Sequence, residues 1–136
     1  MEEVRQQLLL DMGFSQKAVN ILEQELNMYS MENPTISAKH KGTCGDILFL
    51  SLKIENEKIT NAAYEYIGCA GLQSCASALT EMIKGKSVNT ALKFEIDDII
   101  NYLEGIPRQK YECAEIARDC LHKTIQNWKN PGLKVV

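Results

Sequence analysis

The sequence has no apolar run near the ~20 residues that a membrane-spanning helix needs, so no membrane association is expected. It also lacks a basic run, and its 15 basic against 18 acidic residues give a net charge of −3, which argues against a nucleic-acid partner. No internal repeat or low-complexity tract is present, and the acidic start does not have the pattern of a signal peptide. These absences predict one domain of 136 residues that buries a core without disulfides.

Cysteine is present, but in an odd number. Five cysteines in a chain without a signal peptide predict reduced thiols in the cytoplasm. Reduced cysteines of this kind either bind a metal or are buried as small apolar residues. Their positions relative to the predicted strands and helices are therefore informative.

Two strand-like runs, 47–54 and 59–67, flank a polar break and predict an antiparallel hairpin. If the chain reverses at Asn56-Glu57, residues whose numbers sum to 113 face each other. The facing aromatic pairs would then be Phe49 with Tyr64 and Ile47 with Tyr66.

Four side chains with metal-binding chemistry are expected at the open end of this hairpin. Cys44 and Cys69 satisfy the same sum, and Asp46 adds an oxygen ligand close to Cys44. Cys113 begins the apolar stripe of the last predicted helix, and this stripe must pack on the sheet. Spacing does not prove that Cys113 reaches the other cysteines. The alternative is three unrelated core cysteines, and spacing alone favours neither interpretation.

Helical patterns surround the hairpin, and an edge strand is predicted over 36–41. Helices are predicted over residues 1–12, from Ser15 to about Tyr29, and over 71–84, 87–92, 97–103 and 113–128. The fold class is therefore α+β, with a small antiparallel sheet of about three strands and helices packed on one face. Cys69 and Cys113 would each precede a helix, whose dipole would lower the pKa of both thiols.

The motifs around these cysteines resemble the U-type iron–sulfur cluster assembly scaffolds, the IscU/NifU N-terminal family. The resemblance rests on Cys44-Gly45-Asp46, on Gly68-Cys69, on the stretch from Thr80 to Lys86, on Gly105-Ile106-Pro107 with Lys110, and on Cys113. It covers about residues 40–128. It implies a single domain over 1–136, with a scaffold core over 40–128 and extra or remodelled N-terminal helices over 1–30.

The resemblance also implies a function. A scaffold of this family assembles a transient iron–sulfur cluster, most simply [2Fe–2S], from iron and sulfur supplied by a cysteine desulfurase, and passes it to apo iron–sulfur acceptor proteins. It is not a turnover enzyme. Its cluster ligands would be Cys44, Asp46, Cys69 and Cys113, and the same site would accept Zn²⁺. A [4Fe–4S] cluster and a homodimer around the cluster remain open.

Two departures from the family pattern stand beside the site. Glu112 replaces the usual histidine before the last cysteine, and is either an oxygen ligand or an acid at a helix start. Arg108-Gln109 replaces a proline and a hydrophobic residue in the loop that an Hsp70-type chaperone recognises in the family, which puts chaperone recognition in doubt.

Other candidate residues and functions are weaker. Cys75 is expected to pack near the site and Cys120 in the core. His40 is either a spare ligand beside Cys44 or, more commonly for a lone loop histidine, solvated, and Lys110 would attract a persulfide or lie in water. Two other functions remain open: a structural or regulatory zinc protein that uses the same four groups, and a ligand-free adaptor that recruits a partner through its N-terminal helices.

Overall fold

A computed structural model describes residues 2–132, so the first residue and the last four of the predicted domain lie outside the described part. Three strands form one antiparallel sheet in the order β1-β2-β3. The elements are α1 (Glu3–Met12), α2 (Gln16–Gln24), β1 (Ile36–Lys41), β2 (Ile47–Glu55), β3 (Lys58–Ile67), α3 (Ala70–Ile83), α4 (Val88–Ala91), α5 (Ile96–Tyr102), the 3₁₀ turn η1 (Arg108–Lys110) and α6 (Tyr111–Lys129). The predicted α+β class is confirmed.

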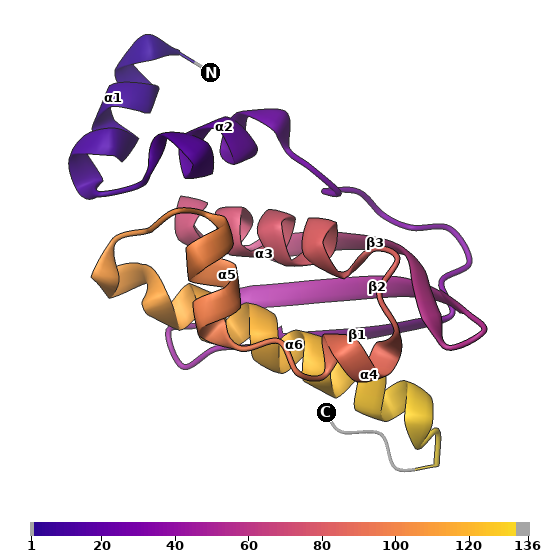
Figure 1. Cartoon of the computed structure of the whole chain (residues 1–136). Helices are drawn as coiled ribbons and strands as arrows, with labels where there is room; N and C mark the ends of the chain where they lie inside the picture. The colour runs from indigo at the N-terminus through magenta and orange to yellow at the C-terminus, as the bar shows by residue number, and fades with distance from the viewer. Residues whose placement is uncertain (1, 133–136) are drawn as a thin grey trace.

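The helices cover one face of this sheet (Figure 1). α6 lies along β1 and β2, while α3 packs on β3 and against α6. Alternate residues of the strands fill the space between the sheet and the helices. Leu48, Leu50 and Leu52 on β2, for example, are completely buried. On the other face, Phe49 and Ile67 remain exposed. No helix among residues 2–132 is both long and apolar enough to cross a membrane.

The hairpin register differs from the prediction by one residue over most of its length. Next to the turn, Ile54 faces Ile59, as predicted. A β-bulge between Lys53 and Ile54 then shifts the pairing, because an extra residue of β3 is accommodated there. The observed partners are Phe49 with Glu65 and Ile47 with Ile67, so the predicted pairs Phe49–Tyr64 and Ile47–Tyr66 are wrong.

The N-terminal helices are shorter or more exposed than expected. Gly13, with a φ of 107°, ends α1, and the Ser15 hydroxyl caps α2 by accepting from the N–H of Ala18, both as predicted. The apolar residues Val4, Leu8 and Met12 on one side of α1 are exposed, and Leu9 on another side is buried.

α2 ends at Gln24 rather than near Tyr29, because the chain leaves the helix to pair with the sheet. Glu25 and Asn27 both adopt positive φ angles, of 49° and 63°. The carbonyl of Asn27 accepts from the N–H of Tyr64, so residues 27–28 run beside β3. Tertiary hydrogen bonds have overridden the helical pattern here.

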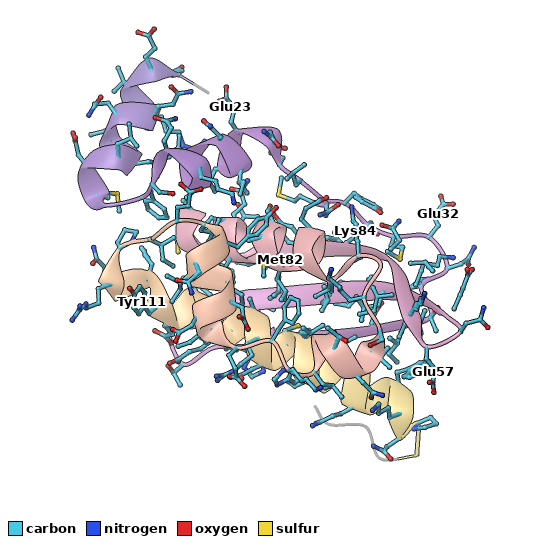
Figure 2. The ribbon with its side chains drawn as sticks, in the orientation of Figure 1. Glu23, Glu32, Glu57, Met82, Lys84 and Tyr111 are labelled. Carbon is cyan, nitrogen blue, oxygen red and sulfur yellow. The ribbon has the colours of Figure 1, made fainter. Side chains whose placement is uncertain are left out.

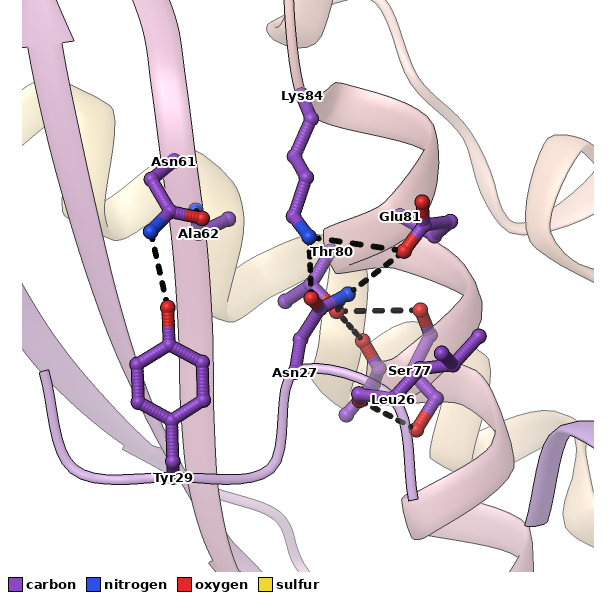
Figure 3. Close-up of polar contacts among 10 residues, drawn as sticks. Leu26, Asn27, Tyr29, Asn61, Ala62, Ser77, Thr80, Glu81 and Lys84 are labelled. Atoms are coloured by element: carbon purple, nitrogen blue, oxygen red, sulfur yellow. Dashed lines mark hydrogen bonds and ion pairs between the residues drawn. The ribbon is translucent and has the colours of Figure 1, made fainter. Parts of the chain in front are cut away.

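A polar network holds this segment on α3 (Figure 3). The Asn27 amide donates to Thr80 Oγ1 at 3.0 Å and to Glu81 Oε2 at 3.1 Å, and its oxygen accepts from the Lys84 ammonium. The Ser77 hydroxyl donates to the carbonyl of Leu26 at 3.0 Å. Four side-chain hydrogen bonds thus fix the connection between α2 and β1.

Replacing Asn27 with glycine is expected to destabilise the fold by about 2 kcal/mol, because three partly buried hydrogen bonds are lost while the left-handed backbone is kept. Asn33→Gly is a matched control, since Asn33 also has a positive φ, of 51°, and is exposed. Urea unfolding of both variants measures the difference. Equal losses in the two variants would contradict the role of the network.

Candidate metal centre

Three elements bring the predicted ligands to one end of the sheet. They are the loop between β1 and β2, the start of α3 and the start of α6, which lie together at the left of Figure 1. Figure 2 labels Tyr111, the first residue of α6, at this end and Glu57, in the β2–β3 turn, at the other. The loop is a tight turn, in which Gly42 donates its N–H to the carbonyl of Asp46 at 2.9 Å.

Asp46, Cys69 and Cys113 form a compact group of donors. Their ligand atoms all lie within 4.8 Å of one another, and among residues 2–132 no other group of at least three such side chains is found. The two sulfurs are 3.8 Å apart. A donor set of two sulfurs and one oxygen suits Zn²⁺ or iron, and leaves one of the usual four coordination positions open.

Two glycines make this close approach possible. A Cβ on Gly68 would lie 2.8 Å from Asp46 Oδ2, and one on Gly71 would lie 3.0 Å from Cys113 Sγ. A side chain at either position would therefore push the donors apart. In the sequence, Gly68 stands out only as part of a motif and Gly71 not at all, although glycines beside a candidate cysteine are a signal of such crowding.

Cys44, the fourth predicted ligand, is not part of the group. It is exposed at the tip of the β1–β2 loop, while Cys69 is half-buried and Cys113 is buried. Strand pairing does not set the position of Cys44 relative to Cys69, because the last strand pair is Ile47 with Ile67 and both cysteines lie beyond it. Cys44 lies outside the donor group, and its role as a ligand stays a prediction.

The two grouped thiols share one proton unequally. A hydrogen bond with Cys113 lowers the pKa of Cys69 to about 5 against the effect of burial, aided by the N–H groups of Leu72 and Gly71 and by the charge of Lys110. Lys110 Nζ lies 3.5 Å from Cys69 Sγ. The same hydrogen bond, burial and the charge of Cys69 raise the pKa of Cys113. The expected lowering therefore holds for Cys69 and is wrong for Cys113.

A thiolate at Cys69 predicts an unusual pH dependence of alkylation. In the metal-free protein, the rate at Cys69 should change little between about pH 6 and about pH 8, whereas an ordinary thiol with a pKa of about 8.5 would react on the order of 100-fold faster at the upper end. Iodoacetamide labelling followed by peptide mass spectrometry measures it. Cys113→Ala removes the main cause of the shift and should restore an ordinary dependence; a steep profile for Cys69 in the unmodified chain would contradict this assignment.

The remaining candidates have other surroundings. Cys75 is buried in α3 outside the donor group, and Cys120 is buried in the core, where its thiol donates weakly to the carbonyls of Ala38 and Leu48. His40 lies 4.0 Å from Asp119 rather than among the donors. Glu112 accepts a hydrogen bond from the Thr43 hydroxyl at 2.7 Å, a contact that no pattern in the sequence indicates.

The sequence model of the NifU-like N terminal domain family matches residues 14–134. The chain belongs to this family. The matched NifU-like segment begins after Gly13, so α1 lies outside it. The family membership indicated by the cysteine motifs is thus confirmed.

Two curated proteins are similar to about two thirds of the chain. The chain is 38% identical over 93 residues to the iron–sulfur cluster assembly protein IscU of Plasmodium falciparum, and 39% identical over 88 residues to the nitrogen fixation protein NifU of a Nostoc species. These alignments cover 68% and 63% of the chain. They span only 57% and 29% of the two relatives, so the NifU-like chain matches part of each.

A solved structure shares the fold. The N-terminal part of a nitrogen-fixing NifU-like protein from Brucella abortus superposes with a TM-score of 0.73 over 89% of this chain and 97% of its own, at 16% identity. Because the fold persists at such low identity, it does not depend on this chain's particular side chains.

Proposed function

We propose that the chain is a scaffold on which an iron–sulfur cluster is assembled and from which it is passed on. The observation that carries the proposal is the grouping of Asp46, Cys69 and Cys113 within 4.8 Å. Soft thiolates hold iron and sulfide, and a carboxylate is a weaker partner for such a cluster. The assembled cluster is the cargo of this site, and its simplest form is [2Fe–2S]. A relative of the chain is named for the same activity.

Cys69 is the residue suited to accept sulfur. Its thiolate would attack the outer sulfur of a desulfurase persulfide, forming a new S–S bond while the desulfurase cysteine leaves as a thiolate. Lys110, 3.5 Å from Cys69 Sγ, would stabilise the negative charge as it moves. Conversion of this sulfur to sulfide takes two electrons from a separate reductant. The protein therefore supplies position and charge rather than redox chemistry, and no turnover reaction is assigned to it.

Cys44 is proposed as the fourth ligand, which joins when the β1–β2 loop moves. The loop carries Gly45 in a left-handed conformation, with a φ of 95°, and residues 43–45 are exposed. A ligand on a short exposed loop can change position without unfolding the strands. The four cluster ligands would then be Cys44, Asp46, Cys69 and Cys113.

Partners follow from this chemistry. A cysteine desulfurase would supply sulfur, and apo iron–sulfur proteins would accept the cluster, in the cytoplasm. Recognition of residues 105–110 by an Hsp70-type chaperone is not proposed. Beyond the replacement by Arg108-Gln109, Ile106 and Pro107 are buried, and Gly13 packs near Pro107. A chaperone would have to displace the turn between α1 and α2 to reach them.

The domain boundaries remain part of the proposal. Residues 40–128 would form the scaffold core and 1–30 the extra or remodelled N-terminal helices of a single domain.

Anaerobic reconstitution with ferrous iron and sulfide tests the function. The expected result is a visible spectrum of bound cluster, two irons and two acid-labile sulfides per site and a Mössbauer spectrum of a [2Fe–2S] centre. Retention of zinc with no labile sulfide would instead favour a zinc protein, which the same donors suit. Unchanged stability with chelator and no metal uptake would favour an adaptor.

A further inference from the structure

One hydrogen bond joins the two segments that carry the outer and the inner thiols. Thr43 Oγ1 donates to Glu112 Oε1 at 2.7 Å. Thr43 directly precedes the exposed Cys44, and Glu112 directly precedes the buried Cys113. The bond therefore ties the tip of the β1–β2 loop to the first turn of α6.

The base of that loop is packed against α6, whereas at its tip the Gly45 N–H donates to the carbonyl of Gly42 at 3.0 Å, a bond within the loop itself. Gly42 is packed against α6, since a Cβ there would lie 2.4 Å from Ile116 Cδ1, and its N–H is bonded to Asp46. Residues 43–45 are exposed. Among residues 2–132, the Thr43–Glu112 hydrogen bond is the only side-chain hydrogen bond that this tip makes. It is thus the contact that selects the position of Cys44.

We propose that Glu112 is a positioning residue that holds Cys44 away from the donor group by accepting the Thr43 hydrogen bond. The inference rests on the proposed function, because it takes Asp46, Cys69 and Cys113 as the first donors to bind metal. Cys44 completes the site only when the Thr43–Glu112 hydrogen bond breaks. Glu112 is then not a metal ligand. Its carboxylate is absent from the donor group and accepts the hydrogen bond of Thr43 instead.

Loss of the hydrogen bond should shift metal-loaded molecules toward ligation by Cys44. One net hydrogen bond of ordinary strength corresponds to about a fivefold change in that equilibrium. In Thr43→Val and Glu112→Ala, Cys44 should therefore be labelled about fivefold more slowly than in the unmodified chain when Zn²⁺ is bound. Thr43→Ser and Glu112→Gln keep a hydroxyl donor and an oxygen acceptor, and should behave like the unmodified chain.

The experiment measures N-ethylmaleimide labelling of each cysteine by peptide mass spectrometry, with and without stoichiometric Zn²⁺. Glu115→Ala is the matched control, because this exposed acid borders the same hollow beside His40 and Thr43 but does not bond to Thr43. Metal-free samples show whether a variant alters the exposure of Cys44 directly. Slow labelling of the buried Cys75 and Cys120 confirms that each variant is folded.

Each outcome separates one hypothesis from another. Equal Cys44 rates in Zn²⁺-loaded Thr43→Val and the unmodified chain would overturn the positioning role. If Glu112→Gln resembled Glu112→Ala, the charge of Glu112 would matter rather than its acceptor, and the inference would also be wrong. If Zn²⁺ failed to protect Cys69 and Cys113 in the unmodified chain, the proposed function itself would fail, and the positioning role with it.

Discussion

The affinity for Zn²⁺ should fall by at least about 100-fold in Cys69→Ala and in Cys113→Ala. Loss of a residue that only hydrogen-bonds to a metal ligand can cost about 10–100-fold in affinity, and loss of the ligand itself should cost more. Each substitution removes one of the two sulfurs of the donor group, 3.8 Å apart, and water replaces a thiolate poorly. Cys44→Ala should also weaken binding, by about tenfold or more, since the fourth position then has no thiol. Competition with a chromophoric chelator measures all three affinities, and iron–sulfide reconstitution should show the same order.

Cys120→Ala is the control for this series. Cys120 is as buried as any residue of the core, and its thiol bonds to the backbone carbonyls of Ala38 and Leu48. Its loss should therefore affect stability by about 1 kcal/mol without changing metal affinity. A variant of Cys44, Cys69 or Cys113 that bound metal as tightly as the unmodified chain would remove that cysteine from the ligand set.

Asp46→Ala should assemble a cluster but deliver it to an apo-ferredoxin about tenfold more slowly, which corresponds to ~1.4 kcal/mol in the activation barrier. A carboxylate is a weaker partner for a cluster than a thiolate, so it provides a position at which an acceptor cysteine can enter. Asp46 is placed for this role, because its ligand atom lies within 4.8 Å of both Cys69 and Cys113. The growth of the circular dichroism signal of cluster-loaded ferredoxin over time gives the transfer rate.

The alternative is that Asp46 only shapes the Cys-Gly-Asp turn by accepting backbone hydrogen bonds. Among residues 2–132, no side chain or N–H donates to its carboxylate, and the turn is closed by its carbonyl oxygen instead. Asp46→Asn distinguishes the two roles, since the amide keeps an acceptor but loses the charge. Transfer by Asp46→Asn as fast as in the unmodified chain would exclude the exchangeable-ligand role.

Local patterns predicted most of the fold because each element carries its own signal. The strand over 36–41, the hairpin around Asn56-Glu57 and the helix from Ala70 to Ile83 follow from alternation, turn residues and helical spacing. The register was predicted incorrectly beyond Lys53 because a β-bulge adds one residue without a distinctive pattern. The length of α2 was also overestimated, because the polar contacts of Asn27 with α3 and β3 end that helix.

The sequence by itself determined the family, the α+β class and the chemistry available, since these depend on residue types in order along the chain. Only the tertiary structure decided which of those groups meet. It brings Asp46 to Cys69 and Cys113 across two glycines and leaves Cys44 outside. It also gives the two thiols opposite pKa shifts, although both lie at helix starts. The physical reason is that a shared proton, a 3.5 Å contact with Lys110 and a bond such as Thr43–Glu112 depend on distances of a few ångströms between segments far apart in the sequence.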